Sequence, residues 1–304
     1  MQELELFKLE NYLQRYLYDK KMQNSAKNTI LTYSRILESF LEYYRGHYEE
    51  ISLEKIDKAF IVAFLNSKAL SSSSKNLYST VLKNFFAYLE NNAYVAIDCK
   101  KCFLELSHKV MKKDPEALSA LEYEKVIAWL ERESQKRRRG FYSYRNAFMI
   151  KLLLLSGIRA SELLALKMED FIPMRSSENK EIYKIKILGK GNKERYTYIA
   201  KENIEKELHF LNPYINTEHP HFLCSTKEGR VLLRSELYLT INAFLKQRGI
   251  AKRGVHMLRH SFGKHMVRKN VNLSTIKELM GHENIQTTMI YARSDEEGMI
   301  RAVV

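Results

Sequence analysis

The sequence predicts a mainly α-helical protein that carries one small antiparallel β-sheet and folds as two domains. Three observations lead to this prediction. Apolar residues recur at helical spacing through most of the chain, one segment alternates as a β-hairpin does, and an aperiodic basic stretch separates two helical regions. A chain of 304 residues, of which 45% are hydrophobic, is long enough to bury a core in each of two domains.

The first hundred residues are predicted to form four or five amphipathic helices. One apolar series at helical spacing runs through 28–44, and another runs through 74–89 after a run of serines suited to capping. Two further amphipathic stretches cover about 3–20 and 53–66. Because no strand alternation appears here, we expect an all-helical N-terminal domain over 1–104.

An interdomain linker is predicted at 105–116, where lysines lie close to a proline and no period is sustained. Such a linker is either a solvated tether or a basic segment that crosses a DNA backbone. Just before it, Cys99 and Cys102 form a CxxC pair, but no second Cys or His pair follows at zinc-finger spacing. We therefore expect two ordinary thiols in a loop, and not a zinc or redox site.

The second domain, over 117–304, is predicted to begin with a helix near Leu118. Ser119 and Glu122 have the spacing of a capping box at its start. The basic run at 136–139 interrupts the helical pattern and is expected to lie in a loop. An apolar, buried helix, AFMIKLLLLSG, then ends at a glycine, and IRASELLALKMEDF follows as a turn and a helix.

The one β signal is a hairpin. In EIYKIKIL, Tyr183, Ile185 and Ile187 alternate with polar residues, and ERYTYIA returns as a second strand after the turn GKGN. From Glu202 to the end the pattern is helical again. The second domain is thus predicted to be α+β.

The charge of the chain favours a polyanionic partner. The formal net charge is +14 and the isoelectric point is near 9.4, which suits phosphate contacts on nucleic acid. No run of about 18 apolar residues occurs, and the N-terminus lacks a signal-peptide core. Together with a low, odd cysteine count, these features predict a cytoplasmic protein with no membrane span.

Six side chains are candidates for metal-free attack on a phosphodiester. This chemistry needs a nucleophile, cations that stabilise the non-bridging oxygens, and a proton for the leaving oxygen. The sequence shows no convincing carboxylate cluster, no HExxH and no phosphate-binding P-loop, so we predict neither a metal nor a cofactor. The candidates, in chain order, are Arg159, Lys190, His256, Arg259, His282 and Tyr291.

Their positions agree with such a site. Arg259 follows His256 by three residues, so both project from one face of a helix, and the planar guanidinium group suits phosphate oxygens. Lys190, in the hairpin turn, could protonate a leaving oxygen. Tyr291 needs neighbouring cations, because a phenol has a pKa near ~10. Each also has an ordinary structural alternative, such as a salt-bridged arginine, a solvated lysine or a tyrosine packed on a core.

Four strings occur in this order: SGIRASELLALK, LGKGNKER, HMLRHSF and MGHENIQTTMIYAR. They closely resemble the motifs of the tyrosine recombinase (phage-integrase) family, with the Xer-like branch nearest. They span about 118–294, and the helical N-terminal region resembles the core-binding domain of that family more loosely.

The resemblance implies a role for each phosphate-binding position. Arg159 and Arg259 would bind the scissile phosphate, and His282 would donate a hydrogen bond to it. Glu162, three residues after the first arginine, matches an acidic position that orients this arginine, and it is a supporting residue.

The resemblance also implies the proton transfers and the nucleophile. Lys190 would act as the general acid toward the 5′-hydroxyl, and His256 would assist proton transfer. Tyr291 would attack and leave a 3′-phosphotyrosyl link. Because the covalent link stores the energy of the broken bond, neither ATP nor a metal would be required.

The implied architecture is a two-domain, C-shaped clamp around double-stranded DNA with inverted half-sites. A homotetramer would assemble on two sites, with or without a second recombinase. In this family a C-terminal segment docks into a neighbouring protomer, but only 13 residues follow Tyr291 here. Either the usual cyclic exchange is altered, or the tail docks through a few apolar residues: Met299, Ile300, Val303 and Val304.

Several functions stay open at this point. A site-specific recombinase could resolve chromosome dimers, with a role in chromosome partition and cell division, or it could integrate a mobile element. A type IB topoisomerase would share the chemistry but would relax supercoils without site preference. A DNA-binding protein that has lost catalysis would require a broken catalytic set, whereas all six positions are filled here.

Overall fold

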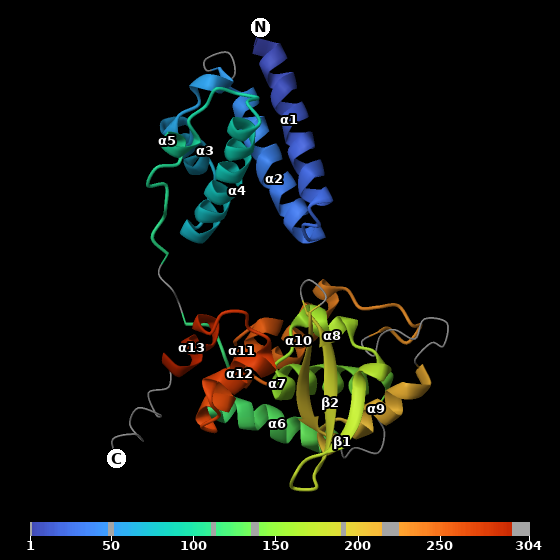
Figure 1. Cartoon of the computed structure of the whole chain (residues 1–304). Coiled ribbons are helices and arrows are strands. Elements are labelled where there is room, and N and C mark those ends of the chain that lie inside the picture. The colour runs from blue at the N-terminus through green and yellow to red at the C-terminus, as the bar shows by residue number, and fades with distance from the viewer. Residues whose placement is uncertain are drawn as a thin grey trace. The chain divides into compact units, whose positions relative to one another are not determined.

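The structure is a computed structural model that describes residues 2–47, 52–110, 114–134, 140–189, 193–214 and 225–293. The chain divides into two compact units, Met1–Lys112 and Lys113–Val304. Figure 1 shows an all-helical first unit, and a second unit in which helices surround a small sheet. The predicted fold class, mainly α with a small antiparallel sheet, is confirmed.

The first unit is built from helices around an aromatic core. The side chain of Phe40 makes edge-to-face contacts with Phe64 and Phe86, and all three rings are almost fully buried. The predicted helix at 53–66 is broken, because the Asp57 side chain caps a new helix by accepting a hydrogen bond from the Phe60 backbone N at 2.9 Å. The elements are α1 (Gln2–Met22), α2 (Lys27–Arg45), the 3-10 turn η1 (Leu53–Lys55), α3 (Lys58–Asn66), α4 (Ser72–Asn91) and α5 (Cys99–Cys102).

The two cysteines of the CxxC pair do not lie in a loop, so that prediction was wrong. They form the single-turn helix α5, which begins where the Asp98 side chain accepts a hydrogen bond from the Lys101 backbone N. Both thiols are buried, and burial raises the pKa of Cys99 to about 11. Within the described ranges, no three His, Cys, Asp or Glu side chains are grouped as metal ligands. The cysteines therefore belong to the core of this unit.

The second unit is organised around helix α7, whose apolar sequence was predicted to be buried. Ala147–Leu154 is almost wholly inaccessible to solvent, and α7 packs against α8, α9, α11 and β3. The helix ends at Gly157, which adopts a left-handed conformation with φ of 64°. The helices are α6 (Ala120–Ser134), α7 (Phe141–Ser156), α8 (Ala160–Ala165), α9 (Glu205–Leu211), α10 (Arg234–Lys246), α11 (Val255–Arg268), α12 (Leu273–Met280) and α13 (Gln286–Arg293).

The start of α6 follows the predicted capping box. The Ser119 backbone N donates to Glu122 Oε2 at 2.7 Å, and the Glu122 backbone N donates to Ser119 Oγ at 3.2 Å. The basic run at 136–139, predicted to lie in a loop, falls outside the described residues. None of the described helices is long and apolar enough to span a membrane.

The sheet has three antiparallel strands in the order β1-β2-β3: β1 (Phe171–Arg175), β2 (Glu181–Leu188) and β3 (Glu194–Ala200). The hairpin of β2 and β3 confirms the prediction, and Ile185 and Ile187 point into the core. Strand β1 was missed: the predicted turn and helix end at Phe171, its first residue, and no element was predicted over 172–175. It contains Pro173, which a strand tolerates at the edge of a sheet, and it pairs with β2 in the register Phe171↔Ile185.

Candidate active site

Five of the six predicted side chains lie within the described residues, and they come from four segments of the second unit. Arg159 is the N-cap of α8, and His256 and Arg259 lie on α11. His282 follows α12 after a glycine, and Tyr291 lies on α13. Since α11 contacts both α12 and α13, the fold brings the separate motifs to one region.

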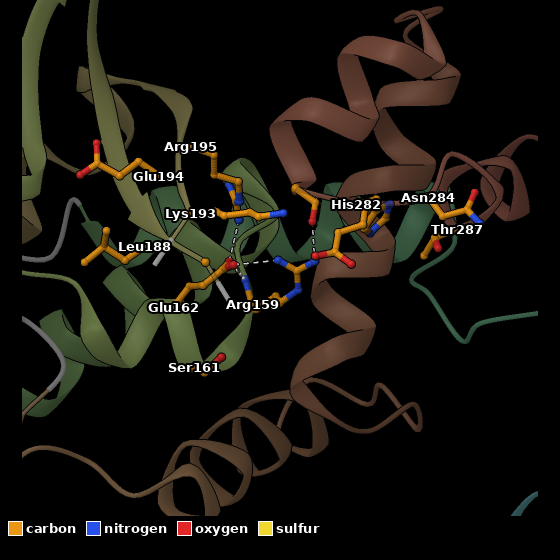
Figure 2. A pocket seen from close by; sticks show the side chains of 13 residues that line it. Arg159, Ser161, Glu162, Leu188, Lys193, Glu194, Arg195, His282, Asn284 and Thr287 are labelled. Atoms are coloured by element: carbon orange, nitrogen blue, oxygen red, sulfur yellow. Dashed lines mark hydrogen bonds and ion pairs between the residues drawn. The ribbon is translucent and has the colours of Figure 1, made fainter. Parts of the chain in front are cut away.

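A buried carboxylate, Glu162, lies at the centre of this region. Its Oε1 accepts a hydrogen bond from Arg159 Nη1 at 2.8 Å, and its Oε2 accepts one from Arg195 Nη2 at 2.6 Å. Arg259 Nη1 lies 4.0 Å from the same Oε2. Figure 2 shows the carboxylate between Arg159 and Arg195, with dashed lines to both. One negative charge therefore holds three guanidinium groups in place.

The local backbone explains why Glu162 points this way. It occupies the third position of α8, and its Oε2 also accepts the Arg159 backbone N at 2.7 Å. This contact is the acidic half of a capping box. The local backbone at the start of the helix therefore orients the carboxylate independently of the contacts it makes with side chains far away in sequence. The structure thus places Glu162 beside Arg159, as the resemblance implied.

Arg259 is almost fully buried, with 4% of its surface exposed. Its Nη1 donates to the Gly157 carbonyl at 2.5 Å and its Nη2 donates to the Met280 carbonyl at 2.6 Å, and these carbonyls end α7 and α12. Carbonyls at helix C-termini carry partial negative charge, which favours a cation there. Burial, followed by the positive charge of Arg159, lowers the pKa of Arg259 to about 10, so it stays charged at neutral pH.

Arg195 is a site residue that the sequence reasoning missed. It extends from β3, where its Nη1 donates to the Leu279 carbonyl at 2.9 Å. Its side chain covers Gly281, where any Cβ would collide with it and where φ is 64°. Arg195 therefore joins the sheet to the end of α12, directly before His282. Its position inside the string LGKGNKER was the available signal.

A cavity of about 820 Å³ opens beside this cluster. Figure 2 shows the side chains of Lys193 and Arg159 extending into the same space. Lys190 falls outside the described residues, whereas Gly189 and Lys193, its described neighbours in the sequence, line the cavity. The lining residues that bear on charge are Arg159, Glu162, Lys193, Glu194, Arg195, His282 and Glu283.

His282 is a neutral imidazole at this site. Burial, followed by the charges of Arg259 and Arg159, lowers the pKa of His282 to about 4. Its Nδ1 lies 2.8 Å from the hydroxyl of Thr288, on helix α13, which orients the ring. Neutral imidazole donates one hydrogen bond and accepts one, so the side chain can donate to a phosphate without adding charge.

Tyr291 is buried, with 1% of its surface exposed. Its hydroxyl lies 2.9 Å from Nδ1 of His260, and its ring stacks near His282 with centroids 6.2 Å apart. Burial raises the pKa of Tyr291 to about 12, although Arg259 and Arg159 draw it down. The phenol is therefore protonated at neutral pH, and its two cationic neighbours would stabilise a phenolate.

His256 and Arg259 share α11, but their surroundings differ. His256 is exposed, and its Nε2 accepts a hydrogen bond from Arg234 Nη2 at 3.1 Å. Desolvation, followed by the charge of Arg234, lowers the pKa of His256. The histidine in contact with the Tyr291 hydroxyl is instead His260, four residues further along the helix, which the sequence reasoning did not single out.

Gly263 allows Tyr291 to pack against α11, and this close approach gives a testable expectation. A Cβ at position 263 would lie 2.6 Å from Cε2 of the Tyr291 ring. We expect Gly263→Ala to lower the free energy of unfolding by about 1–3 kcal/mol, because the ring or the helix must shift. Urea denaturation measures this change.

Gly140→Ala is the matched control for this substitution. Apart from the glycine and its chain neighbours, no atom of the described residues lies within 4 Å of a Cβ built at Gly140, which belongs to the same unit. Its φ of −85° suits any residue, so a cost below about 1 kcal/mol is expected from loss of a glycine N-cap. Equal effects of the two substitutions would mean that the packing of Tyr291 on α11 is looser than the structure indicates.

Two family models match this chain. Residues 116–297 match the phage integrase family, and residues 9–92 match the phage integrase N-terminal SAM-like domain. Among curated relatives, tyrosine recombinase XerH of Campylobacter jejuni is 32% identical over 289 residues, covering 91% of this chain and 78% of the relative. Tyrosine recombinase XerC of Staphylococcus saprophyticus is 28% identical over 297 residues, covering 95% of this chain and 94% of the relative.

Solved structures give the same result. The XerH site-specific recombinase bound to palindromic difH substrate, in a post-cleavage complex, superposes with a TM-score of 0.75 at 26% identity. The match covers 96% of this chain and 83% of that chain. A lambda integrase dimer bound to a COC′ core site has a TM-score of 0.68 at 16% identity, covering 94% of this chain and 78% of that one, which shows a shared fold.

Proposed function

The chain belongs to the phage integrase family and is a tyrosine recombinase, an enzyme that breaks and rejoins DNA strands, and from this premise we propose that Tyr291 is its nucleophile. One observation carries the proposal. Arg159 and Arg259 gather at Glu162, and the charges of both act on the Tyr291 hydroxyl and on His282, although the four side chains lie on separate segments. Such a group of cations beside a phenol suits attack on a phosphodiester.

In the proposed reaction the two arginines bind the non-bridging oxygens of the scissile phosphate. Arg159 has 36% of its side chain exposed, so its guanidinium can meet a phosphate that enters from the cavity. The buried Arg259 stabilises the negative charge of the same phosphate, and Glu162 keeps Arg159 and Arg259 oriented. His282, neutral at physiological pH, donates a hydrogen bond to the phosphate.

The bond changes follow from these positions. Tyr291 Oη forms a bond to phosphorus while the bond from phosphorus to the 5′-oxygen breaks, leaving a 3′-phosphotyrosyl link. We propose Lys190 as the general acid that protonates the 5′-oxygen, because Gly189 and Lys193, its described neighbours in the sequence, line the cavity. His256, which lies on α11 three residues before Arg259, is proposed to assist this proton transfer. Rejoining reverses these steps, so neither ATP nor a metal enters the proposed scheme.

The proposed partner is double-stranded DNA with inverted half-sites, bound by a clamp of two domains. The net charge of +14 supports phosphate contacts along the duplex. We propose that 1–104 is a helical DNA-binding domain, that 105–116 is a linker, and that 117–304 is the catalytic domain. The structural relatives named XerH and lambda integrase are bound to DNA, which supports this partner.

A homotetramer on two sites, with or without a second recombinase, is the proposed assembly. The tail that would join protomers, with Met299 and Val304, lies outside the described residues. Chromosome dimer resolution is the favoured biological role, because the curated relatives carry Xer names, and mobile-element integration is the second candidate. The match to the N-terminal SAM-like domain favours a recombinase over a type IB topoisomerase.

Plasmid substrates test this function. One supercoiled plasmid carries two directly repeated copies of a palindromic site taken from the source genome, and a control plasmid carries none. With EDTA present, we expect two smaller circles from the first plasmid and no relaxation of the second. Relaxation of both plasmids at equal rates, without exchange, would instead identify a topoisomerase. Binding without any strand breakage would identify a DNA-binding protein.

A further inference from the structure

The contact between Tyr291 and His260 is not explained by the roles assigned so far. The Tyr291 hydroxyl and His260 Nδ1 are 2.9 Å apart, which is the length of a good hydrogen bond. The two rings are inclined at 53°, with centroids 5.8 Å apart, so the contact is through the polar atoms and not through stacking. His260 directly follows Arg259 on α11, so one short stretch of helix contacts both the phosphate site and the nucleophile.

A neutral His260 ring allows this hydrogen bond to run from the phenol to the imidazole. Burial, followed by the coulombic effects of His256, Arg259 and Lys264, lowers the pKa of His260 to about 4. A neutral imidazole with its proton on Nε2 presents a lone pair at Nδ1. The phenol, whose pKa is raised, then donates its proton to that lone pair. The hydrogen bond is therefore aligned for transfer of this proton.

The surroundings make a proton acceptor useful at this position. A phenol is a poor nucleophile while it is protonated, and Tyr291 is too buried to pass its proton directly to solvent. His256, the histidine that the motif pattern favours for proton transfer, has its Nε2 occupied by Arg234. His260 is in hydrogen-bond contact with the reacting oxygen itself.

We propose that His260 is a catalytic residue that accepts the phenolic proton of Tyr291 during strand cleavage. As Tyr291 Oη bonds to phosphorus, the Oη–H bond breaks and the proton passes to Nδ1, while the 5′-oxygen leaves with a proton from the general acid. The imidazolium that forms lies beside a phosphate carrying more negative charge than before attack. In rejoining, the same nitrogen returns the proton to the departing phenol. This inference rests on the proposed role of Tyr291 as nucleophile.

Two substitutions separate proton transfer from positioning. His260→Asn can place an amide oxygen near the position of Nδ1, where it accepts the hydrogen bond but cannot take the proton. His260→Phe removes both functions. We expect both variants to form the covalent adduct on a nicked suicide substrate about 10²–10⁴-fold more slowly than the unaltered protein. DNA binding, measured by gel shift, should be unchanged.

A chemical rescue identifies the affected proton. Incorporation of 3,5-difluorotyrosine at position 291 gives a more acidic phenol, so it should recover part of the rate in both His260 variants. A substrate with a 5′-bridging phosphorothiolate has a better leaving group, and it should not restore the rate of adduct formation in the His260 variants. Lys190→Ala is the matched control and should show the reverse pattern, since its defect lies in protonating the leaving oxygen.

Three results would overturn the inference. A wild-type or faster adduct rate in His260→Phe would mean that the contact is dispensable or holds the nucleophile back. Full activity of His260→Asn would reduce the residue to a positioning role. If 3,5-difluorotyrosine did not speed adduct formation in the slow His260 variants, His260 would likewise have only a positioning role. Adduct formation by Tyr291→Phe would instead contradict the proposed function, which distinguishes the two failures.

Discussion

A Tyr291→Phe variant should bind DNA as the unaltered protein does and should form no covalent protein–DNA complex. Phenylalanine keeps the ring that packs against Gly263 and near His282, and it loses only the hydroxyl that contacts His260. Without that oxygen no bond to phosphorus can form at this position, so we expect the rate to fall by at least about 10⁴-fold. A labelled, nicked suicide substrate measures the adduct on a denaturing gel.

Tyr123→Phe is the matched control for this experiment. Tyr123 is also a buried tyrosine of the second unit, with 3% exposure, and its hydroxyl donates to the Leu154 carbonyl at 3.3 Å. Both variants therefore lose one buried hydrogen bond of similar worth, about 1 kcal/mol. The control should keep its adduct rate. An adduct that persists in Tyr291→Phe would place the nucleophile elsewhere, and equal losses in the two variants would indicate a general loss of folding.

The parts of the fold with a strong local pattern could be predicted from the sequence. The apolar run that became α7 and the alternation of β2 and β3 each contain their own signal, as does the capping box of Ser119 and Glu122. Strand β1 has no such signal, since Pro173 interrupts it and its pairing with β2 defines it. The break before α3 depended on one aspartate that competes with an otherwise continuous helical pattern.

The sequence predicts which residue types the candidate site contains, but not how they are arranged. The motifs identified the arginines, the histidines and Tyr291, yet they gave no sign that Arg259 is buried while His256 is exposed on the same helix. Arg195 and His260 were missed because the contacts that single them out are with partners far away in sequence, namely Glu162 and Tyr291. Single-sequence patterns report local periodicity and contain little information on such contacts.

The charge balance of the site follows from this arrangement. Three guanidinium groups around a single carboxylate leave an excess of two positive charges in a largely buried cluster. A phosphodiester carries one negative charge, and it gains a second as an anionic nucleophile adds. In the proposed reaction the fixed cations are therefore matched better to the transition state than to the bound substrate, which is the condition for electrostatic catalysis.

Glu162→Gln should both destabilise the protein and slow strand cleavage. The substitution keeps the shape of the side chain but removes the charge that balances Arg195 and Arg259, which are both largely buried. Loss of one partner from a buried ion pair costs about 3–5 kcal/mol, and we expect a change of that order in urea denaturation. The released arginines should also slow adduct formation per folded molecule, by about 10-fold or more, because an error of 1 Å in their placement weakens phosphate binding in the transition state.

Glu207→Gln separates these two effects, since Glu207 is fully buried and pairs with Lys151 at 2.9 Å in the same unit. Glu207 and Lys151 lie on α9 and α7, and neither lines the cavity beside Arg159. This control should lose comparable stability and should keep its adduct rate, measured at a temperature where both variants are folded. If both variants cleaved at the wild-type rate, the carboxylate of Glu162 would stabilise the fold without orienting the arginines. If Glu162→Gln and Glu207→Gln were slowed equally, the loss of rate would reflect the lower stability of the unit. Orientation of the arginines by Glu162 would then make no contribution of its own to catalysis.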